Sequence, residues 1–135
     1  MTENDVVCGT PPIAFTFGLG GLLAFPLRYG ASTVLLEKHT PETLLQTVAK
    51  YRATILFGTA TFLSLYTRNR KVAPVMLDSL RFVVAGAEKL PEKVRQDFQL
   101  KFNKFILEGY GATETTPVAS VNVPDAVDTS DWKIQ

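Results

Sequence analysis

The chain is poor in the side chains that most often serve as nucleophiles, bases or transition-metal ligands. It has one cysteine and one histidine among its 135 residues. A lone cysteine cannot form a disulfide within the chain, so nothing in the sequence indicates an oxidising compartment. A zinc site needs about four Cys, His or carboxylate ligands, and this chain has too few soft ones. A Ser-His or Cys-His catalytic pair would depend on His39, which we predict to be a surface residue in a loop before a helix.

The sequence also lacks a long uninterrupted apolar stretch and a basic run. Its most hydrophobic segment, residues 13–27, contains four glycines or prolines, whereas a membrane span needs roughly 20 consecutive apolar residues. The first five residues are polar and acidic, which does not fit a signal peptide. The formal net charge is only +1, which gives no indication of a nucleic-acid partner. We therefore predict a cytoplasmic protein without a transmembrane segment.

Short β-branched runs alternate with helical patterns along the chain. Four apolar runs predict buried strands, at residues 32–36, 54–57, 80–85 and 105–107, and residues 118–123 form a candidate fifth strand. The runs do not alternate apolar with polar residues, which is typical of parallel sheets covered on both faces. This order predicts an α/β fold with a mainly parallel, Rossmann-like sheet flanked by helices. We expect residues 1–124 to form one α/β unit and residues 125–135 to be a poorly ordered polar tail.

The spacing of apolar residues predicts four helices, at residues 19–29, 41–51, 60–69 and 92–102. Thr40 is the expected N-cap of the second helix, because Pro41 fits the first helical position. In the last helix, apolar residues recur every four positions, and the charged residues between them are expected to face water. Those charged residues are Lys93, Arg95, Asp97 and Lys101.

Two glycine-containing segments follow predicted strands, and in open parallel sheets ligands bind at the carboxyl ends of the strands. The first is Gly86-Ala87-Glu88, and the second is Glu108-Gly109-Tyr110-Gly111-Ala112-Thr113-Glu114. Glycine lets a ligand approach the backbone closely, a tyrosine offers a flat face to a base, and a hydroxyl beside a carboxylate suits a phosphate and its magnesium ion. The alternative is a plain turn at Gly109–Gly111 with Glu114 capping the next element. No Gly-x-x-x-x-Gly-Lys-Ser/Thr loop is present, and the glycines at 18–21 are better explained by helix packing.

At Tyr110-Gly111-Ala112-Thr113-Glu114 the chain resembles the adenylate-forming superfamily of acyl-CoA synthetases, aryl-CoA ligases and peptide-synthetase adenylation domains. The resemblance extends from about residue 5 to residue 124. It includes residues 85–91, which look like the family's Gly-Ala segment, and residues 12–18, which look like its aromatic motif, although Phe15 stands where many members have histidine. Residues 14–37 are most similar to benzoate- and aminobenzoate-type CoA ligases, whereas residues 57–63, 83–89 and 107–111 look more like acyl-carrier-protein synthetases.

The resemblance implies a role for each matching residue. Tyr110 would stack on adenine, Thr113 would contact the α-phosphate, and Glu114 would bind magnesium; Thr113 and Glu114 are the catalytic candidates. The cofactor-binding candidates are Gly86, Ala87, Glu88, Glu108, Gly109, Tyr110, Gly111 and Thr113. The acyl pocket would be shaped by Phe15, Phe17, Gly58 and Gly109.

The resemblance also defines what the chain does not contain. The family's phosphate loop, ribose-binding aspartate, hinge and C-terminal lysine have no counterpart here, so the chain is expected to be one subdomain of an ATP-dependent acid–thiol ligase. Its substrates would be ATP, a fatty or aromatic carboxylic acid, and a thiol of CoA or of a carrier protein. We expect the isolated chain to be inactive and to self-associate through uncovered apolar surface. The alternatives are a stand-alone nucleotide-binding or interaction module, and a structural fragment without a ligand.

Overall fold

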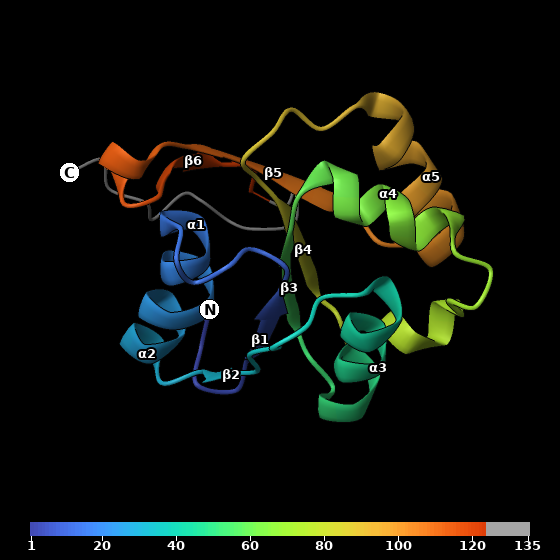
Figure 1. Ribbon diagram of the computed structural model, residues 1–135, viewed down its shortest axis with the longest axis horizontal. Helices are drawn as coiled ribbons and strands as arrows, with labels where there is room; N and C mark the ends of the chain where they lie inside the picture. Colours follow the sequence, from blue (N-terminus) through green and yellow to red (C-terminus); the bar gives the residue numbers. More distant parts are fainter. Residues whose placement is uncertain (124–135) are drawn as a thin grey trace.

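A six-stranded sheet runs through residues 1–123, which are the residues that the computed structural model describes (Figure 1). Its order is β2-β1-β3-β4-β5-β6. The parallel strands are β1 (Val6–Gly9), β2 (Ser32–Thr33), β3 (Ile55–Gly58), β4 (Phe82–Ala85) and β5 (Ile106–Gly111), and β6 (Val118–Val121) is antiparallel to β5. The predicted α/β fold with a mainly parallel sheet is therefore confirmed. The tail expected at residues 125–135 lies outside the described residues.

Strand β1 was not predicted, although it lies in the interior of the sheet. Val7 pairs with Thr33 of β2 on one side and with Ile55 of β3 on the other. Val7 and Cys8 are fully buried. The only sequence signal is the short apolar run Val6-Val7-Cys8 after a polar start, which is too brief to be distinguished from a loop.

Strand β5 differs most from its predicted form. It begins at Ile106, one residue later than predicted, and continues to Gly111. Phe105, which was expected to be a buried strand residue, is 68% exposed. The extension exists because β6 folds back beside it, with Gly109 opposite Val121 and Tyr110 opposite Ser120. Residues 108–111, which were expected to follow the strand, therefore form its second half. These residues are half-buried or exposed, so the expectation that the strands are fully buried is wrong for β5.

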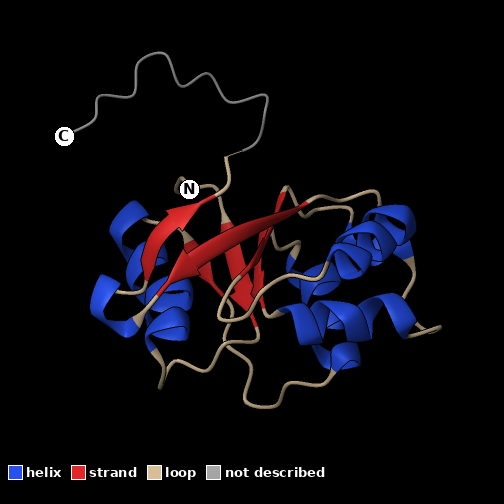
Figure 2. Cartoon of the chain, turned by 90° about the horizontal axis from the view of Figure 1, so that it is seen from above, coloured by secondary structure: helices blue, strands red, loops and turns tan. Residues whose placement is uncertain are grey.

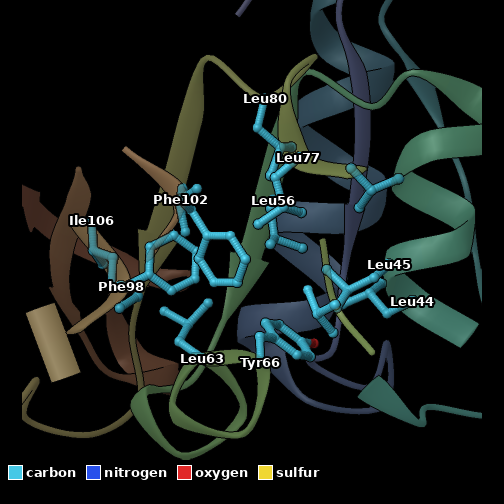
Figure 3. Close-up of a cluster of buried hydrophobic side chains, with 14 of the residues drawn as sticks. Leu44, Leu45, Leu56, Leu63, Tyr66, Leu77, Leu80, Phe98, Phe102 and Ile106 are labelled. Atoms are coloured by element: carbon cyan, nitrogen blue, oxygen red, sulfur yellow. The ribbon is translucent and has the colours of Figure 1, made fainter. Parts of the chain in front are cut away.

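Three helices cover one face of the sheet: α3 (Pro41–Tyr51), α4 (Ala60–Arg68) and α5 (Glu92–Phe102), with the short 3-10 turn η2 (Pro74–Leu77) between the last two (Figure 1). Their buried side chains form the main core, shown in Figure 3. Thr40 caps α3 as predicted: its Oγ1 accepts the Thr43 amide at 3.1 Å, and the Thr40 amide donates to Thr43 Oγ1 at 3.0 Å. Such a reciprocal pair satisfies amides that would otherwise lack partners at a helix start.

The opposite face carries one helical stretch instead of three helices (Figure 2). It comprises α1 (Thr16–Leu19), the π-helical turn η1 (Gly20–Ala24) and α2 (Phe25–Tyr29). Its glycines allow close packing, as predicted, because a Cβ on Gly21 would lie 3.3 Å from the Phe57 ring and one on Gly20 would lie 2.5 Å from Pro117 Cδ. This stretch packs a small core of Val7, Leu22, Ile55 and Phe57. The face of β4 and β5 beside it is left largely open.

Lys101 on α5 does not face water as expected. Its Nζ donates to the carbonyl oxygens of Tyr66, Thr67 and Asn69 at 3.1, 3.0 and 2.7 Å. These carbonyls close the carboxyl end of α4, where a cation is favourable because they lack partners within the helix. Partial burial lowers the pKa of Lys101. The periodicity of α5 places this residue on the polar side but does not reveal the neighbouring helix end.

Neither the cysteine nor the histidine is placed for nucleophilic chemistry. Cys8 lies fully buried in β1, and burial raises the pKa of its thiol to about 12, so the thiolate is suppressed. His39 is half-buried rather than fully on the surface, and its Nδ1 has no hydrogen-bond partner within residues 1–123. No helix in the described part of the chain has the length and apolar character required to cross a bilayer.

Candidate functional site

An open cavity of about 790 Å³ lies along the face of β3, β4 and β5 that α3, α4 and α5 do not cover, and it extends to the carboxyl ends of these strands, between α1 and the β5–β6 hairpin. The carboxyl ends are the edge of a parallel sheet where ligands are expected, and the volume is in the range of small-molecule sites. The cavity brings together most of the residues selected from the sequence, from motifs more than 90 positions apart: Phe15, Phe17, Gly86, Ala87, Gly109, Tyr110, Gly111 and Thr113.

A second hollow of about 670 Å³ adjoins the first. It is lined by Glu88 and Glu108, and it shares Ala87, Gly109, Tyr110 and Gly111 with the larger cavity. Tyr110 therefore borders both spaces, and its side chain is 72% exposed. The phenol ring is therefore accessible from both spaces.

Gly58 is the one candidate for the acyl pocket that does not line the cavity. A Cβ at this position would lie 3.5 Å from Leu63, on the side of the main core. Its carbonyl oxygen instead accepts the Gly86 amide at 3.1 Å. Gly58 thus holds the first residue of the loop after β4 by a backbone hydrogen bond. Its position does not support a role in contacting an acyl group.

Glu88 binds the start of α4. Its Oε1 accepts the Thr61 amide at 2.7 Å, and this hydrogen bond lowers the pKa of the Glu88 carboxyl. A carboxylate is favourable at a helix N-terminus because the first amides lack partners. The preceding residue, Ala87, has a φ of 69°, a left-handed conformation that costs a non-glycine residue roughly 1 kcal/mol. The turned backbone at Ala87 lets Glu88 reach α4 while Gly86 and Ala87 border the cavity.

Glu108 is also engaged within the chain. One carboxylate oxygen accepts the Leu90 amide at 3.1 Å, and the other accepts Arg95 Nη2 at 3.1 Å. Arg95 also donates to the Ile106 carbonyl at 3.0 Å, so it lies against β5 and does not simply face water as predicted. Two hydrogen bonds therefore fix the segment from Gly86 to Leu90. Glu88 binds the Thr61 amide of α4, and the Leu90 amide binds Glu108 of β5. This role of Arg95 could not be predicted from the sequence, because its partner Glu108 is 13 residues away on another element.

We predict that Arg95→Met loosens this segment without unfolding the protein. Arg95 and Glu108 are each about one-third exposed, at 32% and 34%, so the loss should be about 1 kcal/mol. Hydrogen exchange followed by NMR should show faster exchange at the Leu90 amide. Lys93→Met is the matched control, since Lys93 is 82% exposed and should leave that amide unchanged. Equal protection of Leu90 in both variants would contradict the predicted role.

Thr113 and Glu114 lie in the 3-10 turn η3 (Thr113–Thr115) that follows β5. Thr113 Oγ1 lies 3.3 Å from Thr16 Oγ1 at the start of α1, so one hydroxyl hydrogen-bonds the other across the cavity mouth. Thr16 was not selected from the sequence, although it lies within the aromatic segment. Glu114 is exposed, lines neither hollow, and has no hydrogen-bond or ion-pair partner within residues 1–123.

Metal binding by the protein alone has little support. Among residues 1–123, no group of three or more His, Cys, Asp or Glu side chains is close enough to hold a metal ion. Magnesium that arrives with a nucleotide needs fewer protein ligands, because phosphate oxygens and water fill most of its coordination sphere. Glu114 fits this second situation as a single accessible carboxylate.

Comparison with known proteins identifies the class of protein that this fold and site define. The chain matches the AMP-binding enzyme family over residues 1–133, and it belongs to that family. It is 34% identical over 115 residues to the benzoate–CoA ligase of Thauera aromatica, covering 84% of this chain and 22% of that protein. It is 30% identical over 128 residues to the 4-hydroxybenzoate–CoA/benzoate–CoA ligase of Rhodopseudomonas palustris, covering 93% of this chain and 24% of that protein.

A solved structure agrees with this assignment. A benzoate CoA ligase from Burkholderia xenovorans LB400 superposes with a TM-score of 0.86 at 29% identity, over 95% of this chain and 26% of that one. The fold is therefore that of part of an adenylate-forming enzyme. The chain spans about a quarter of the length of the relatives that it matches.

Proposed function

We propose that this chain supplies part of the nucleotide and acyl site of an ATP-dependent acid–thiol ligase. In that reaction a carboxylate oxygen bonds to the α-phosphorus of ATP as the bond to pyrophosphate breaks. A thiol sulfur, of CoA or of a carrier protein, then bonds to the acyl carbon, its proton passes to solvent, and AMP leaves. The observation that carries the proposal is that Tyr110 and Thr113 border the same cavity as Gly86 and Phe17.

The described residues suit this chemistry because it needs positioning and charge stabilisation more than a side-chain nucleophile. The exposed Tyr110 ring stacks on the adenine, and the backbone at Gly86 and Ala87 borders it. The Thr113 hydroxyl donates to the α-phosphate from the cavity mouth. Glu114 would hold the magnesium ion that accompanies ATP, whose charge offsets that of the phosphates.

Ligand binding by the 135-residue chain tests the proposal. A non-hydrolysable acyl-sulfamoyl adenosine, which mimics an acyl-adenylate, is titrated into ¹⁵N-labelled protein and compared with AMP. We expect both to shift the amide signals of Ala87, Tyr110 and Thr113, and the acylated compound to bind more tightly, because it occupies both parts of the cavity. Binding should be weak, since the chain spans about a quarter of its relatives.

Tyr110→Ala should weaken AMP binding about tenfold, which corresponds to the loss of one base–aromatic stack. Tyr51→Ala is the matched control, because Tyr51 is also exposed, at 48%, but ends α3 on the other side of the sheet. An AMP affinity that is unchanged in Tyr110→Ala, or the absence of any shift with either compound, would contradict the proposal. Self-association of the chain remains a prediction, which sedimentation velocity of the same samples tests.

A further inference from the structure

Two contacts, one helical turn apart, join α1 to the turn η3 that follows β5, and the two elements lie side by side in Figure 1. Thr16, the first residue of α1, places its Oγ1 3.3 Å from Thr113 Oγ1. Four residues further along the same helical stretch, Gly20 lies so close to Pro117 that a Cβ on Gly20 would be 2.5 Å from Pro117 Cδ. Residues four apart on a helix share a face, so one face of this stretch packs against residues 113–117.

The backbone of the same turn is held from within by Thr115. Its Oγ1 accepts the Ala112 amide and donates to the Pro117 carbonyl oxygen, both at 2.9 Å. The Thr113 hydroxyl is not used in these bonds and is directed to Thr16 at the cavity mouth. Thr16 therefore orients the Thr113 hydroxyl, while other groups fix the backbone that carries it.

The direction of the hydrogen bond between the two threonines follows from what a third partner could accept. A hydroxyl has one proton to donate and two lone pairs with which to accept, and either threonine can be the donor in the pair. An ionised phosphate oxygen is an acceptor. Once Thr113 donates its proton to a phosphate, Thr16 is the residue that must donate within the pair. The two bonds then form a chain, and the first strengthens the second by polarising the Thr113 hydroxyl.

We propose that Thr16 is a positioning residue for the phosphate contact of Thr113: its hydroxyl donates to Thr113 Oγ1 and directs the Thr113 proton at the phosphate of the ligand. This role rests on the proposed function, in which Thr113 contacts the α-phosphate. Thr16 acts through Thr113, so its contribution belongs to the phosphate alone. Stacking of a base on Tyr110 should not depend on it.

AMP and adenosine, which differ by the phosphate, separate this role from a general structural one. Each is titrated into the ¹⁵N-labelled 135-residue chain, and the shifts of the Tyr110 and Thr113 amides give the dissociation constants. We expect AMP to bind the unmodified chain about tenfold more tightly than adenosine, the gain typical of a hydrogen bond to a charged group.

Thr16→Val keeps the shape of the side chain and removes the hydroxyl. It should weaken AMP about fivefold, as expected for the loss of one hydrogen bond, and leave adenosine within about twofold. Thr16→Ser keeps the hydroxyl and should restore AMP binding to within about twofold of the unmodified chain. Thr67→Val is the matched control, because Thr67 is also half-buried in a helix, α4, on the other face of the sheet. It should change neither affinity.

A double-mutant cycle tests whether Thr16 acts through Thr113. Thr113→Val alone should remove the advantage of AMP over adenosine. Adding Thr16→Val to that variant should then change AMP affinity by less than about twofold, because the group that Thr16 orients is already gone. Losses that simply add in the double variant would mean that Thr16 acts independently, and they overturn the proposed role.

The remaining outcomes distinguish this role from the proposed function. Selective weakening of AMP in Thr16→Val, with rescue by Thr16→Ser, supports it. An AMP advantage that survives Thr16→Val, equal weakening of AMP and adenosine, or no rescue by serine overturns the role of Thr16 and leaves the proposed function intact. Equal binding of AMP and adenosine to the unmodified chain overturns the role together with the phosphate contact of Thr113. Failure of both compounds to bind overturns the role and the proposed function.

Discussion

Phe98→Ala should reduce the free energy of unfolding by about 4 kcal/mol, the loss expected when a buried phenyl ring is removed from a packed core. Phe98 lies on α5 and is completely buried, and its ring centroid lies 4.7 Å from that of Phe102 (Figure 3). The cavity left behind lies between α5 and the sheet, where neighbouring helices limit collapse. Urea unfolding followed by far-UV circular dichroism measures the change as a lower midpoint with an unchanged slope.

Leu100→Ala provides the matched control for this prediction. Leu100 is two positions further along the same helix, but it is 85% exposed, so its truncation should change stability by less than about 0.5 kcal/mol. Similar losses in the two variants would mean that the face of α5 that packs against the sheet has been assigned incorrectly.

Asp5→Ala should cost about 3 kcal/mol, because it removes a buried carboxylate that holds three strands together. Asp5 is 2% exposed and accepts hydrogen bonds from Arg81 Nε and Nη2, the Thr54 hydroxyl and the Thr2 amide, at 2.7 to 2.9 Å. Asp5, Thr54 and Arg81 immediately precede β1, β3 and β4. They therefore join the amino ends of these three strands.

The same carboxylate makes stability depend on pH. Its hydrogen bonds with Arg81 hold the pKa of Asp5 well below its usual range. Because the folded pKa is the lower one, this stabilisation is complete above the unfolded value of about 3.9 and is lost as the pH falls below it. Asp5→Ala should therefore be less stable than the unmodified chain at pH 7, and the difference should shrink toward pH 2. Glu3→Ala, at an exposed position, should show no such convergence; a constant difference for Asp5→Ala would contradict the assignment.

Much of the fold could be predicted from the sequence because periodicity and capping are local properties. Helices α3 and α5 have the predicted bounds, and Thr40 caps α3 as expected. The missed strand β1 has only four residues, so it has no room for a period, and its place in the interior depends on strands that come later. The environments of Arg95 and Lys101 could not be predicted for the same reason, since their partners lie on β5 and at the end of α4.

The candidate site was predictable to a similar extent. Residue type and order predicted that Gly86, Tyr110 and Thr113 belong together, and the structure places all three around one cavity. Sequence order could not show that Gly58 faces the core, nor that the carboxylates of Glu88 and Glu108 are engaged by Thr61 and Arg95. These contacts depend on which elements pack beside each residue, and they become known only once the helices and strands are assembled.

The interior position of β1 has a consequence for biosynthesis. Strand β1 pairs with β2 and β3, which follow it in the chain and end at Thr33 and Gly58. The carboxylate of Asp5 gains its ion pair later still, because Arg81 lies 76 residues downstream. Contacts over such distances close slowly, so during synthesis β1 and the Asp5 carboxylate remain open to chaperones or proteases until β3 and Arg81 have also been made.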